Sequence, residues 1–465
     1  MSFFIRTGNS IKQNEKILSK QNKGKKRKGH EHSSERKSKH KKGGDEDIES
    51  DDEDEVPVAQ QNSNNIAYES DENYETAQEK KLRLAKLYLE EIERKERKLR
   101  ENGEVGKDDI TNYLKEDLRE KTHRNRKTVA DTYSGYDDSG ILRLSCKEQY
   151  LPITCLVVSF DNKYVYSGSK GSAIVKWSLE EGKKQKVVKH KDLKGNKKSL
   201  GIVLCLAISS DNKFLVSGSS NCEINVWNPE TLAHIHTFSG HKGEVTGVAF
   251  QRNQHTLFSV STDRCVKVWN LTEMVYVESL YGHQKKITAV DAFLSERALT
   301  SGEDNSVHLW KIVEESQLIY NANGGVDGVK FVNESFFLSC GSDGALCLWG
   351  VLKKRPLCTI HKAHGVDETN DQPHWLTSIS TLINTDLVAS GSCNGVVKLW
   401  KCRDDFKKLE LLFDIPIKGF VNGLQFTHDG KYLVAAVGSE HKLGRWQVMK
   451  DVKNSVLVIP LCKKS

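Results

Sequence analysis

The fold of this chain can be read from the stretch His255-Thr-Leu-Phe-Ser-Val-Ser-Thr-Asp-Arg-Cys-Val-Lys-Val-Trp-Asn270. Residues 257–260 and 265–269 are short runs rich in apolar and β-branched side chains, and the polar run 261–264 separates them. Such a pattern predicts two antiparallel strands joined by a tight turn, with Trp269 at the end of the second strand.

The same unit recurs along the chain. A terminal Trp with an Asp six residues before it is found again at Asp304/Trp310 and Asp343/Trp349, and relaxed copies end at Trp177, Trp227, Trp400 and Trp446. Successive tryptophans of this set are 39 to 51 residues apart. A period near 40 with about four strands per copy is typical of a propeller. We therefore predict an all-β fold, a seven-bladed β-propeller over residues 140–465.

The composition excludes several classes of protein. The chain has 465 residues, of which 37% are hydrophobic and 29% charged, and no run of 18 apolar residues predicts a transmembrane helix. The first residues lack the apolar core of a secretory signal. Eleven cysteines are scattered without a Cys-x-x-Cys pair, which favours buried thiols in a reducing compartment over disulfides or zinc.

Residues 1–74 are predicted to be a disordered tail, first basic and then acidic. Eleven Lys and Arg lie between Lys20 and Lys42, and nine acids lie between Asp45 and Glu55. The cluster Lys25, Lys26, Arg27 and Lys28 with the later basic run has the form of a nuclear import signal, although a merely solubilising tail is the alternative. Ser50 and Ser70 precede acids and are candidate phosphorylation sites.

Residues 75–139 are predicted to be a helical extension with two short amphipathic helices. Leucines, alanine and isoleucine at helical spacing mark the first helix, at 76–101, which also carries Arg83 and Lys86. The second helix, at 109–123, is followed by Arg124 and Arg126. Neither helix can bury its apolar stripe alone, so each packs either on the propeller or on a partner, and amphipathicity does not choose between these.

Two long junctions and one closing strand complete the expected array. Residues 183–198, rich in lysine, are expected to be a loop between blades one and two, and residues 361–375 a loop between blades five and six. The ring can be closed either by the N-terminal strand 141–146 or by the C-terminal strand 455–461, and closure removes exposed sheet edges. The sequence leaves both possibilities open.

Here the sequence resembles the WD-repeat family. Two blades carry that family's hydrogen-bonded tetrad, formed by His241, Ser259, Asp263 and Trp269 and by His283, Thr300, Asp304 and Trp310. An indole N–H, a hydroxyl, an imidazole and a carboxylate can form one buried polar chain that ties three strands together. The other blades depart from the pattern, so blades three and four are expected to be the most rigid.

The same residue types do not predict an enzyme. The Ser, His and Asp set repeats and is expected to be buried, whereas a nucleophile needs an exposed, base-activated hydroxyl and an oxyanion site. We find no glycine-rich loop that could bind phosphate. We also find no set of residues with metal-ligand spacing: His361, His364 and His374 share one loop, but their intervals are irregular. No cofactor and no metal are expected.

Several segments outside the generic repeat resemble a narrower family, the U3 small nucleolar RNA-interacting WD-repeat (U3 55-kilodalton) proteins. They are Glu75–Ile92, Val313–Leu318, Lys353–Leu357, Asn384–Ser392 and Leu443–Trp446. The resemblance implies a non-catalytic protein of the nucleolus, within the nucleus, that belongs to the U3 box C/D small nucleolar ribonucleoprotein. It also implies binding to U3 small nucleolar RNA beside the kink-turn-binding protein, membership of the small-subunit processome, and a role in pre-rRNA processing toward small-subunit rRNA. No membrane contact is implied.

Lysines and arginines supply the charge that RNA phosphates need, and no RNA-recognition motif with exposed aromatics is apparent. The candidates for contact with RNA are Lys183, Lys184, Lys186, Lys189, Lys191, Arg83, Lys86, Arg124, Arg126, Arg264 and Lys267. For each of them a merely solvated charge is the alternative. Trp375, outside the repeat units, is a candidate for binding a protein partner, or it packs on its own blade.

The alternative function is a nuclear WD-repeat scaffold for protein interactions, either a ubiquitin-ligase adaptor or a chromatin-associated protein, because the fold alone does not fix the ligand.

Overall fold

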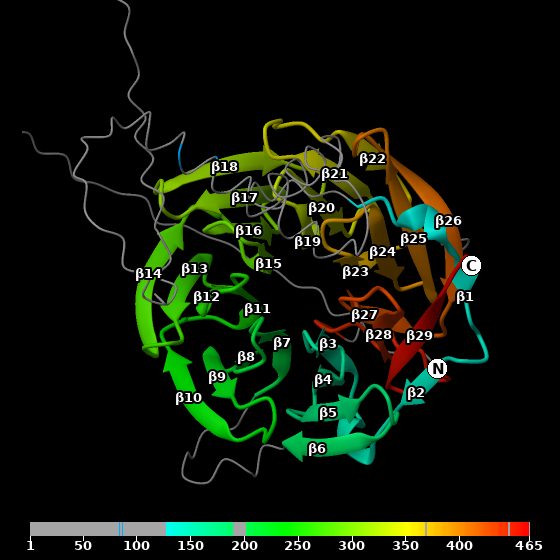
Figure 1. Ribbon diagram of the computed structural model, residues 1–465, viewed down its shortest axis with the longest axis horizontal. Coiled ribbons are helices and arrows are strands. Elements are labelled where there is room, and N and C mark those ends of the chain that lie inside the picture. The colour runs from blue at the N-terminus through cyan, green and yellow to red at the C-terminus, as the bar shows by residue number, and fades with distance from the viewer. Residues whose placement is uncertain are drawn as a thin grey trace, which may run out of the picture. The chain divides into compact units, whose positions relative to one another are not determined.

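The computed structural model describes Arg83, Lys86 and residues 127–188, 201–367, 370–444 and 447–464. Between residues 127 and 464 the described chain forms seven β-sheets, six with four strands and one with five, arranged radially around a central axis (Figure 1). The prediction of an all-β, seven-bladed propeller is confirmed. Among the described residues, no helix is both long and apolar enough to span a membrane.

Each of the first six blades is a meander of four consecutive antiparallel strands. Blade one contains β3 (Ile153–Val158), β4 (Tyr164–Ser169), β5 (Ile174–Ser178) and β6 (Lys184–Val188). Blade two contains β7 (Val203–Ile208), β8 (Leu215–Ser219), β9 (Glu223–Trp227) and β10 (His234–Ser239). Blade three contains β11 (Val245–Phe250), β12 (Thr256–Ser261), β13 (Cys265–Asn270) and β14 (Val275–Tyr281).

The second half of the ring repeats this order. Blade four contains β15 (Ile287–Ala292), β16 (Arg297–Gly302), β17 (Ser306–Lys311) and β18 (Ser316–Asn321). Blade five contains β19 (Val326–Asn333), β20 (Phe336–Gly341), β21 (Leu346–Gly350) and β22 (Cys358–Ile360). Blade six contains β23 (Leu376–Thr381), β24 (Leu387–Ser392), β25 (Val396–Arg403) and β26 (Lys408–Pro416).

The apolar core lies between neighbouring blades, because the faces of adjacent sheets pack on one another. One cluster joins Tyr166 and Ile174 of blade one to Leu206 and Trp227 of blade two, and all four are buried. Burial of apolar surface stabilises such a pair of sheets at roughly 25 cal/mol per Å². All eleven cysteines are free thiols, and burial raises the pKa of Cys155 to about 12.

Blade seven is built from both ends of the described chain. Its strands β27 (Phe420–Phe426), β28 (Tyr432–Gly438) and β29 (Ser455–Lys463) pair in order, and β1 (Tyr133–Tyr136) and β2 (Leu142–Leu144) both pair with β29. Leu142 lies opposite Val458, and Tyr136 lies opposite Leu461. Both candidate strands therefore take part in closure: the C-terminal strand is third in the sheet, and the N-terminal strands cover its outer edge.

This arrangement corrects the seventh sequence unit, which we expected to end at Trp446. The chain leaves β28 at Gly438 and returns to the sheet at Ser455, so residue 446 precedes the third strand. Ala436 pairs with Val456, as Ser259 pairs with Lys267 in blade three, which puts Val458 in the place that Trp269 occupies there. The tryptophan was misassigned because a long insertion separates the two strands.

The N-terminal strands are held by one buried carboxylate of blade six. Asp386, which is 2% exposed, accepts hydrogen bonds through Oδ1 from the backbone N–H groups of Val129 (2.7 Å) and Ala130 (2.9 Å). Ala130 begins the 3-10 helix η1 (Ala130–Thr132), which leads directly into β1. The sheet thus begins at Tyr133, inside the range 75–139 that we assigned to the helical extension. Of the two predicted helices, only Arg83 and Lys86 are described, and both are helical and exposed.

Hydrogen bonds around the channel join the innermost strands of five pairs of neighbouring blades. Thr154, Thr246, Thr288 and Thr377 each donate from Oγ1 to a backbone carbonyl of the next blade, at 2.5 to 2.7 Å. Asn422 joins blade seven to blade one, because its Nδ2 donates to the carbonyl of Ile153 at 2.9 Å. These bonds fix the blades relative to one another.

One end of the channel is closed by the segment between β28 and β29. His441, Lys442 and Leu443 lie against Leu204, Thr246, Thr288 and Asp327 of four neighbouring blades. The segment is anchored by Asn422, whose side chain binds the backbone of Glu440 and Lys442 at 3.0 Å each. A buried ion pair between Lys170 and Glu440 (2.8 Å) adds to this anchor. At the opposite end the described residues leave the channel open.

Replacing Asp386 with alanine is expected to destabilise the protein, because two backbone N–H groups lose their acceptor. The unfolding free energy should fall by about 1 to 3 kcal/mol. Asp386→Asn keeps one carbonyl acceptor at the same place and should lose much less. Thermal unfolding followed by circular dichroism measures both variants, and equal melting temperatures for Asp386→Ala and the parent chain would contradict the role of this carboxylate.

Candidate nucleic-acid interface

The tetrad of blade three is a continuous chain of hydrogen bonds. The Trp269 indole Nε1 donates to Ser259 Oγ at 2.8 Å, and Ser259 Oγ also binds His241 Nε2 at 2.8 Å. His241 Nδ1 then binds Asp263 Oδ2 at 2.9 Å. Hydrogen bonds to the carboxylate from His241 and the backbone of Lys242 outweigh burial and hold the pKa of Asp263 at about 2.

Blade four repeats this geometry. Trp310 Nε1 donates to Thr300 Oγ1 at 2.9 Å, His283 Nε2 binds the same oxygen at 2.9 Å, and His283 Nδ1 binds Asp304 Oδ2 at 2.9 Å. Ser259 and Thr300 have no exposed surface. A hydroxyl with two partners and no access from solvent cannot attack a substrate, so the tetrads hold strands together.

Other blades keep the indole-to-hydroxyl bond and differ in the rest of the tetrad. In blade six, His364 Nε2 binds Ser390 Oγ at 2.8 Å, and Trp400 Nε1 donates to the same oxygen at 2.8 Å. His364 is therefore a tetrad histidine and not an ordinary loop histidine. Sequence reasoning missed it because 26 residues separate it from Ser390, against 18 between His241 and Ser259.

In blade one, glutamine takes the place of histidine. Gln149, in the 3-10 helix η2 (Lys147–Gln149), donates from Nε2 to Ser167 Oγ at 2.8 Å, and Trp177 Nε1 donates to the same oxygen at 2.8 Å. Gln149 lies 18 residues before Ser167, the same interval as in blade three. This interval was the signal that could have found it. In blades two and five the indoles of Trp227 and Trp349 donate to Ser217 and Ser339.

One cluster of side chains has the spacing of a metal site. The ligand atoms of His283, Asp304 and His308 lie within 4.8 Å of one another. Hydrogen bonding accounts for this spacing, because both ring nitrogens of His283 already bind Thr300 and Asp304. His308 stacks on His283 with ring centroids 3.9 Å apart, and burial lowers the pKa of His308 to about 4.

The lysines expected in the first junction loop lie partly on a strand. Lys184 and Lys186 belong to β6, the outermost strand of blade one, and Lys183 precedes it, so the loop assignment is wrong for residues 184–188. All three side chains are exposed. Lys184 forms an ion pair with Glu148 at 3.0 Å. Lys189 and Lys191 lie outside the described residues.

The remaining candidates are not gathered at one place by any described contact. Arg264 is exposed on the turn between β12 and β13. Lys267 is already engaged, since its Nζ donates to Ser279 Oγ at 2.8 Å and lies 4.8 Å from the centre of the Tyr276 ring. Outside the described residues lie Arg124 and Arg126 and the import signal Lys25, Lys26, Arg27 and Lys28.

Trp375 packs at the closed end of the channel. Its indole Nε1 donates to Asp327 Oδ2 at 2.6 Å, and its ring lies 4.1 Å from the ring of His441. Burial raises the pKa of Asp327, and the indole bond opposes this rise. Trp375 therefore helps to hold the closing segment in place. These contacts of its ring are with blade five and that segment, and not with its own blade as the sequence alternative had it.

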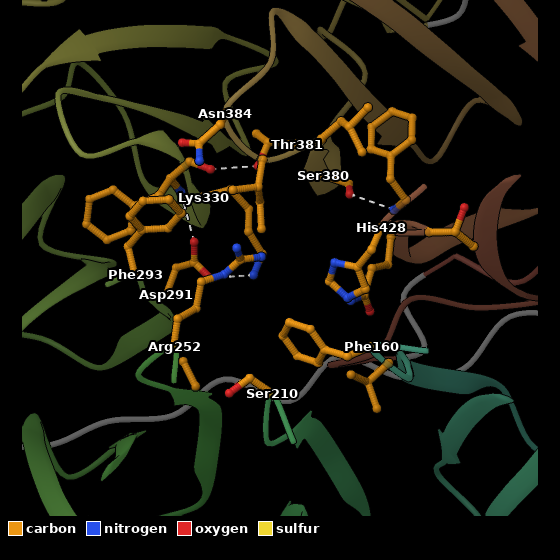
Figure 2. A pocket seen from close by; sticks show the side chains of 18 of the residues that line it. Phe160, Ser210, Arg252, Asp291, Phe293, Lys330, Ser380, Thr381, Asn384 and His428 are labelled. Atoms are coloured by element: carbon orange, nitrogen blue, oxygen red, sulfur yellow. Dashed lines mark hydrogen bonds and ion pairs between the residues drawn. The ribbon is translucent and has the colours of Figure 1, made fainter. Parts of the chain in front are cut away.

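The open end of the channel is a cavity of about 730 Å³ that sequence reasoning missed. We call it the vestibule; its wall contains Phe160, Ser210, Arg252, Asp291, Phe293, Lys330, Asn384 and His428, which surround an opening in Figure 2. Seven of these residues lie at or just after the ends of the innermost strands of six blades, and Lys330 lies within β19. No local motif marks them, because only closure of the ring brings them together.

The family described as WD domain, G-beta repeat matches residues 187–228, 232–270, 274–311 and 365–401. The chain is 43% identical over 394 residues to the human U3 small nucleolar RNA-interacting protein 2, covering 83% of this chain and 82% of that protein. It is 26% identical over 365 residues to ribosomal RNA-processing protein 9 of Saccharomyces cerevisiae, covering 64% and 55% of the two chains. A solved structure of U3-55K is 44% identical and covers 70% of this chain and all of its own, with a TM-score of 0.67.

Loss of the hydroxyl should cost more in blade three than in blade five. Ser259→Ala leaves both Trp269 Nε1 and His241 Nε2 without their partner, whereas Ser339→Ala removes the partner of Trp349 Nε1 and of no histidine among the described residues. A buried polar group without a partner costs about 1 to 3 kcal/mol, so we expect Ser259→Ala to be the more destabilising by about 1 kcal/mol or more. Urea unfolding of the two variants gives the difference, and equal losses would contradict it.

Stability should fall as the pH drops below about 6.5. Burial, and then the charge of Lys398, lower the pKa of His364 from 6.5 to about 3. A histidine that folding keeps neutral contributes stability above its unfolded pKa, and this contribution is lost as the pH falls toward the folded pKa. For such a group the loss between pH 6.5 and pH 5 is up to about 2 kcal/mol.

Urea unfolding at pH 7 and pH 5 tests this pH dependence. His364→Gln, which copies the glutamine of blade one, should lose less stability between the two pH values than the parent chain. A loss as large in His364→Gln as in the parent chain would show that this histidine is not responsible.

Proposed function

Because the chain belongs to the family of U3 small nucleolar RNA-interacting WD-repeat proteins, we propose that it is a non-catalytic component of the U3 box C/D small nucleolar ribonucleoprotein. In this role it binds U3 small nucleolar RNA and supports processing of pre-rRNA toward small-subunit rRNA. The observation that carries the proposal is the 43% identity that extends over 82% of the human relative, far beyond the repeat units alone. The name of the yeast relative, ribosomal RNA-processing protein 9, adds rRNA processing.

The architecture supports a role in binding rather than catalysis. The serine, threonine, histidine and aspartate side chains that could serve as catalytic groups in blades three and four are consumed by the tetrads. Within the particle we expect the partners to be the box C/D core proteins, including the kink-turn-binding protein, and other proteins of the small-subunit processome. The corresponding location is the nucleolus, reached through the import signal at Lys25–Lys28.

We place the first RNA contact on the lysines at the outer edge of blade one. Lys183 and Lys186 are exposed and have no carboxylate partner among the described residues, and the ion pair of Lys184 is exposed and therefore weak. The lysine side chains of a basic edge strand can bind phosphates of the RNA backbone, and such contacts do not depend on base sequence. The proposed set of RNA contacts also includes Lys189, Lys191, Arg124, Arg126, Arg83 and Lys86.

Charge reversal of the lysine cluster tests the proposal. Changing Lys183, Lys184, Lys186, Lys189 and Lys191 to Glu should weaken binding of U3 RNA. It should also reduce the slope of log affinity against log salt by about 0.7 to 0.9 for each lost phosphate contact. Filter binding at several salt concentrations gives both values. The control is Lys353→Glu with Lys354→Glu, two exposed lysines of blade five.

Two separate measurements test the position of the RNA site and the membership of the particle. An unchanged slope would remove the cluster from the RNA site without touching the membership of the particle. Ultraviolet crosslinking in cells tests that membership: no direct crosslink to U3 RNA, with partners that survive ribonuclease, would favour the alternative of a nuclear protein scaffold.

A further inference from the structure

The vestibule contains an arginine that forms an ion pair with no carboxylate of the described residues. Among the described residues, the Arg252 guanidinium makes no hydrogen bond and no ion pair. It lies between two phenyl rings, 5.7 Å from the centre of Phe160 and 5.4 Å from that of Phe293. The side chain is half-buried, and desolvation lowers its pKa. A partly desolvated guanidinium without an acceptor is costly unless a ligand supplies one.

The nearest carboxylate is already occupied. Asp291 accepts hydrogen bonds from Lys330 Nζ at 2.6 Å and from the backbone N–H of Phe331 at 2.8 Å. These two donors fix the carboxylate on the wall of the vestibule beside Arg252 (Figure 2). The arginine therefore receives only a general attraction from Asp291, and its five N–H donors remain available to a ligand.

A second polar atom on the opposite wall has no partner. His428 stacks on Phe160 with ring centroids 4.2 Å apart, and its Nε2 is buried without a hydrogen bond. The backbone N–H of His428 is held by Asn162 at 2.8 Å, which fixes the ring against Phe160. Arg252, Phe160 and His428 thus form a preorganised row from three blades, with the guanidinium at one end and the imidazole at the other.

We propose that the vestibule binds an extended acidic peptide segment of a partner protein, with one Asp or Glu carboxylate paired to Arg252. A guanidinium binds a carboxylate through two parallel hydrogen bonds, so the site would select a carboxylate by geometry as well as by charge. A cavity of about 730 Å³ lies within the usual range for ligand sites and holds several side chains. Below Arg252 the wall is apolar, with Leu156, Leu206 and Val248, and takes up apolar neighbours of the acidic residue.

The same observations disfavour single-stranded RNA as the occupant. Non-specific RNA sites need open aromatic faces on which bases stack. Phe160 is covered by His428 on one face and approached by Arg252, and Phe293 is 2% exposed.

Selection of peptides on the full-length protein tests the proposal. A random heptapeptide library displayed on phage is panned against the parent chain, against Arg252→Gln and against Arg355→Gln, an exposed arginine between β21 and β22. We expect the enriched peptides to carry Asp or Glu beside apolar residues. A synthetic copy of the most enriched peptide should bind Arg252→Gln roughly tenfold to a hundredfold more weakly and bind Arg355→Gln unchanged.

The controls leave each outcome decisive. If Arg252→Gln melts at a lower temperature than the parent chain, Arg252→Lys replaces it; it keeps the charge, loses the planar fork and should still bind more weakly. No enrichment, enrichment of peptides without acids, or equal binding to the arginine variants would overturn the proposal. A random single-stranded RNA pool is selected in parallel. RNA whose binding is lost in Arg252→Gln, without a corresponding peptide, would assign the vestibule to RNA instead. Neither outcome bears on the lysines of β6.

Discussion

This propeller depends on a hydrogen bond from a buried indole on the third strand of a blade to a hydroxyl on the second strand. It occurs in the first six blades at 2.8 to 2.9 Å, from Trp177, Trp227, Trp269, Trp310, Trp349 and Trp400. Each bond links the third strand to the second, and the hydroxyl then accepts or relays a further bond where histidine or glutamine is present. Because an unpaired indole N–H inside a sheet is costly, each blade has one preferred strand register.

A second set of bonds turns these separate sheets into one body. Threonines on four innermost strands donate to the next blade at distances of 2.5 to 2.7 Å, and Asn422 joins blade seven to blade one. The ring is thereby rigid around the channel, while its outer strands differ in charge and length. This division explains how one scaffold can hold a basic edge strand on blade one and a vestibule on its axis without mixing the two.

The sequence was sufficient for the fold because tryptophans at intervals of 39 to 51 residues report the blades directly. It was insufficient where an insertion hides the interval. His364 and the third strand of blade seven were both displaced from the expected positions by long connections, whereas Gln149 was overlooked because its residue type differs. The vestibule could not be predicted at all, since Phe160, Arg252 and His428 are far apart in the chain and meet only through the circular arrangement.

Closure of blade seven also has a consequence for synthesis on the ribosome. The strand that β1 and β2 require, β29, is made after every other strand, so the first strands have no partner while the chain is being elongated. Until β29 is made, the nascent protein exposes unpaired strand edges on both sides of the incomplete blade seven, and chaperones bind such edges. A translation arrest anywhere before residue 455 therefore yields an open array with exposed edges rather than a smaller finished protein.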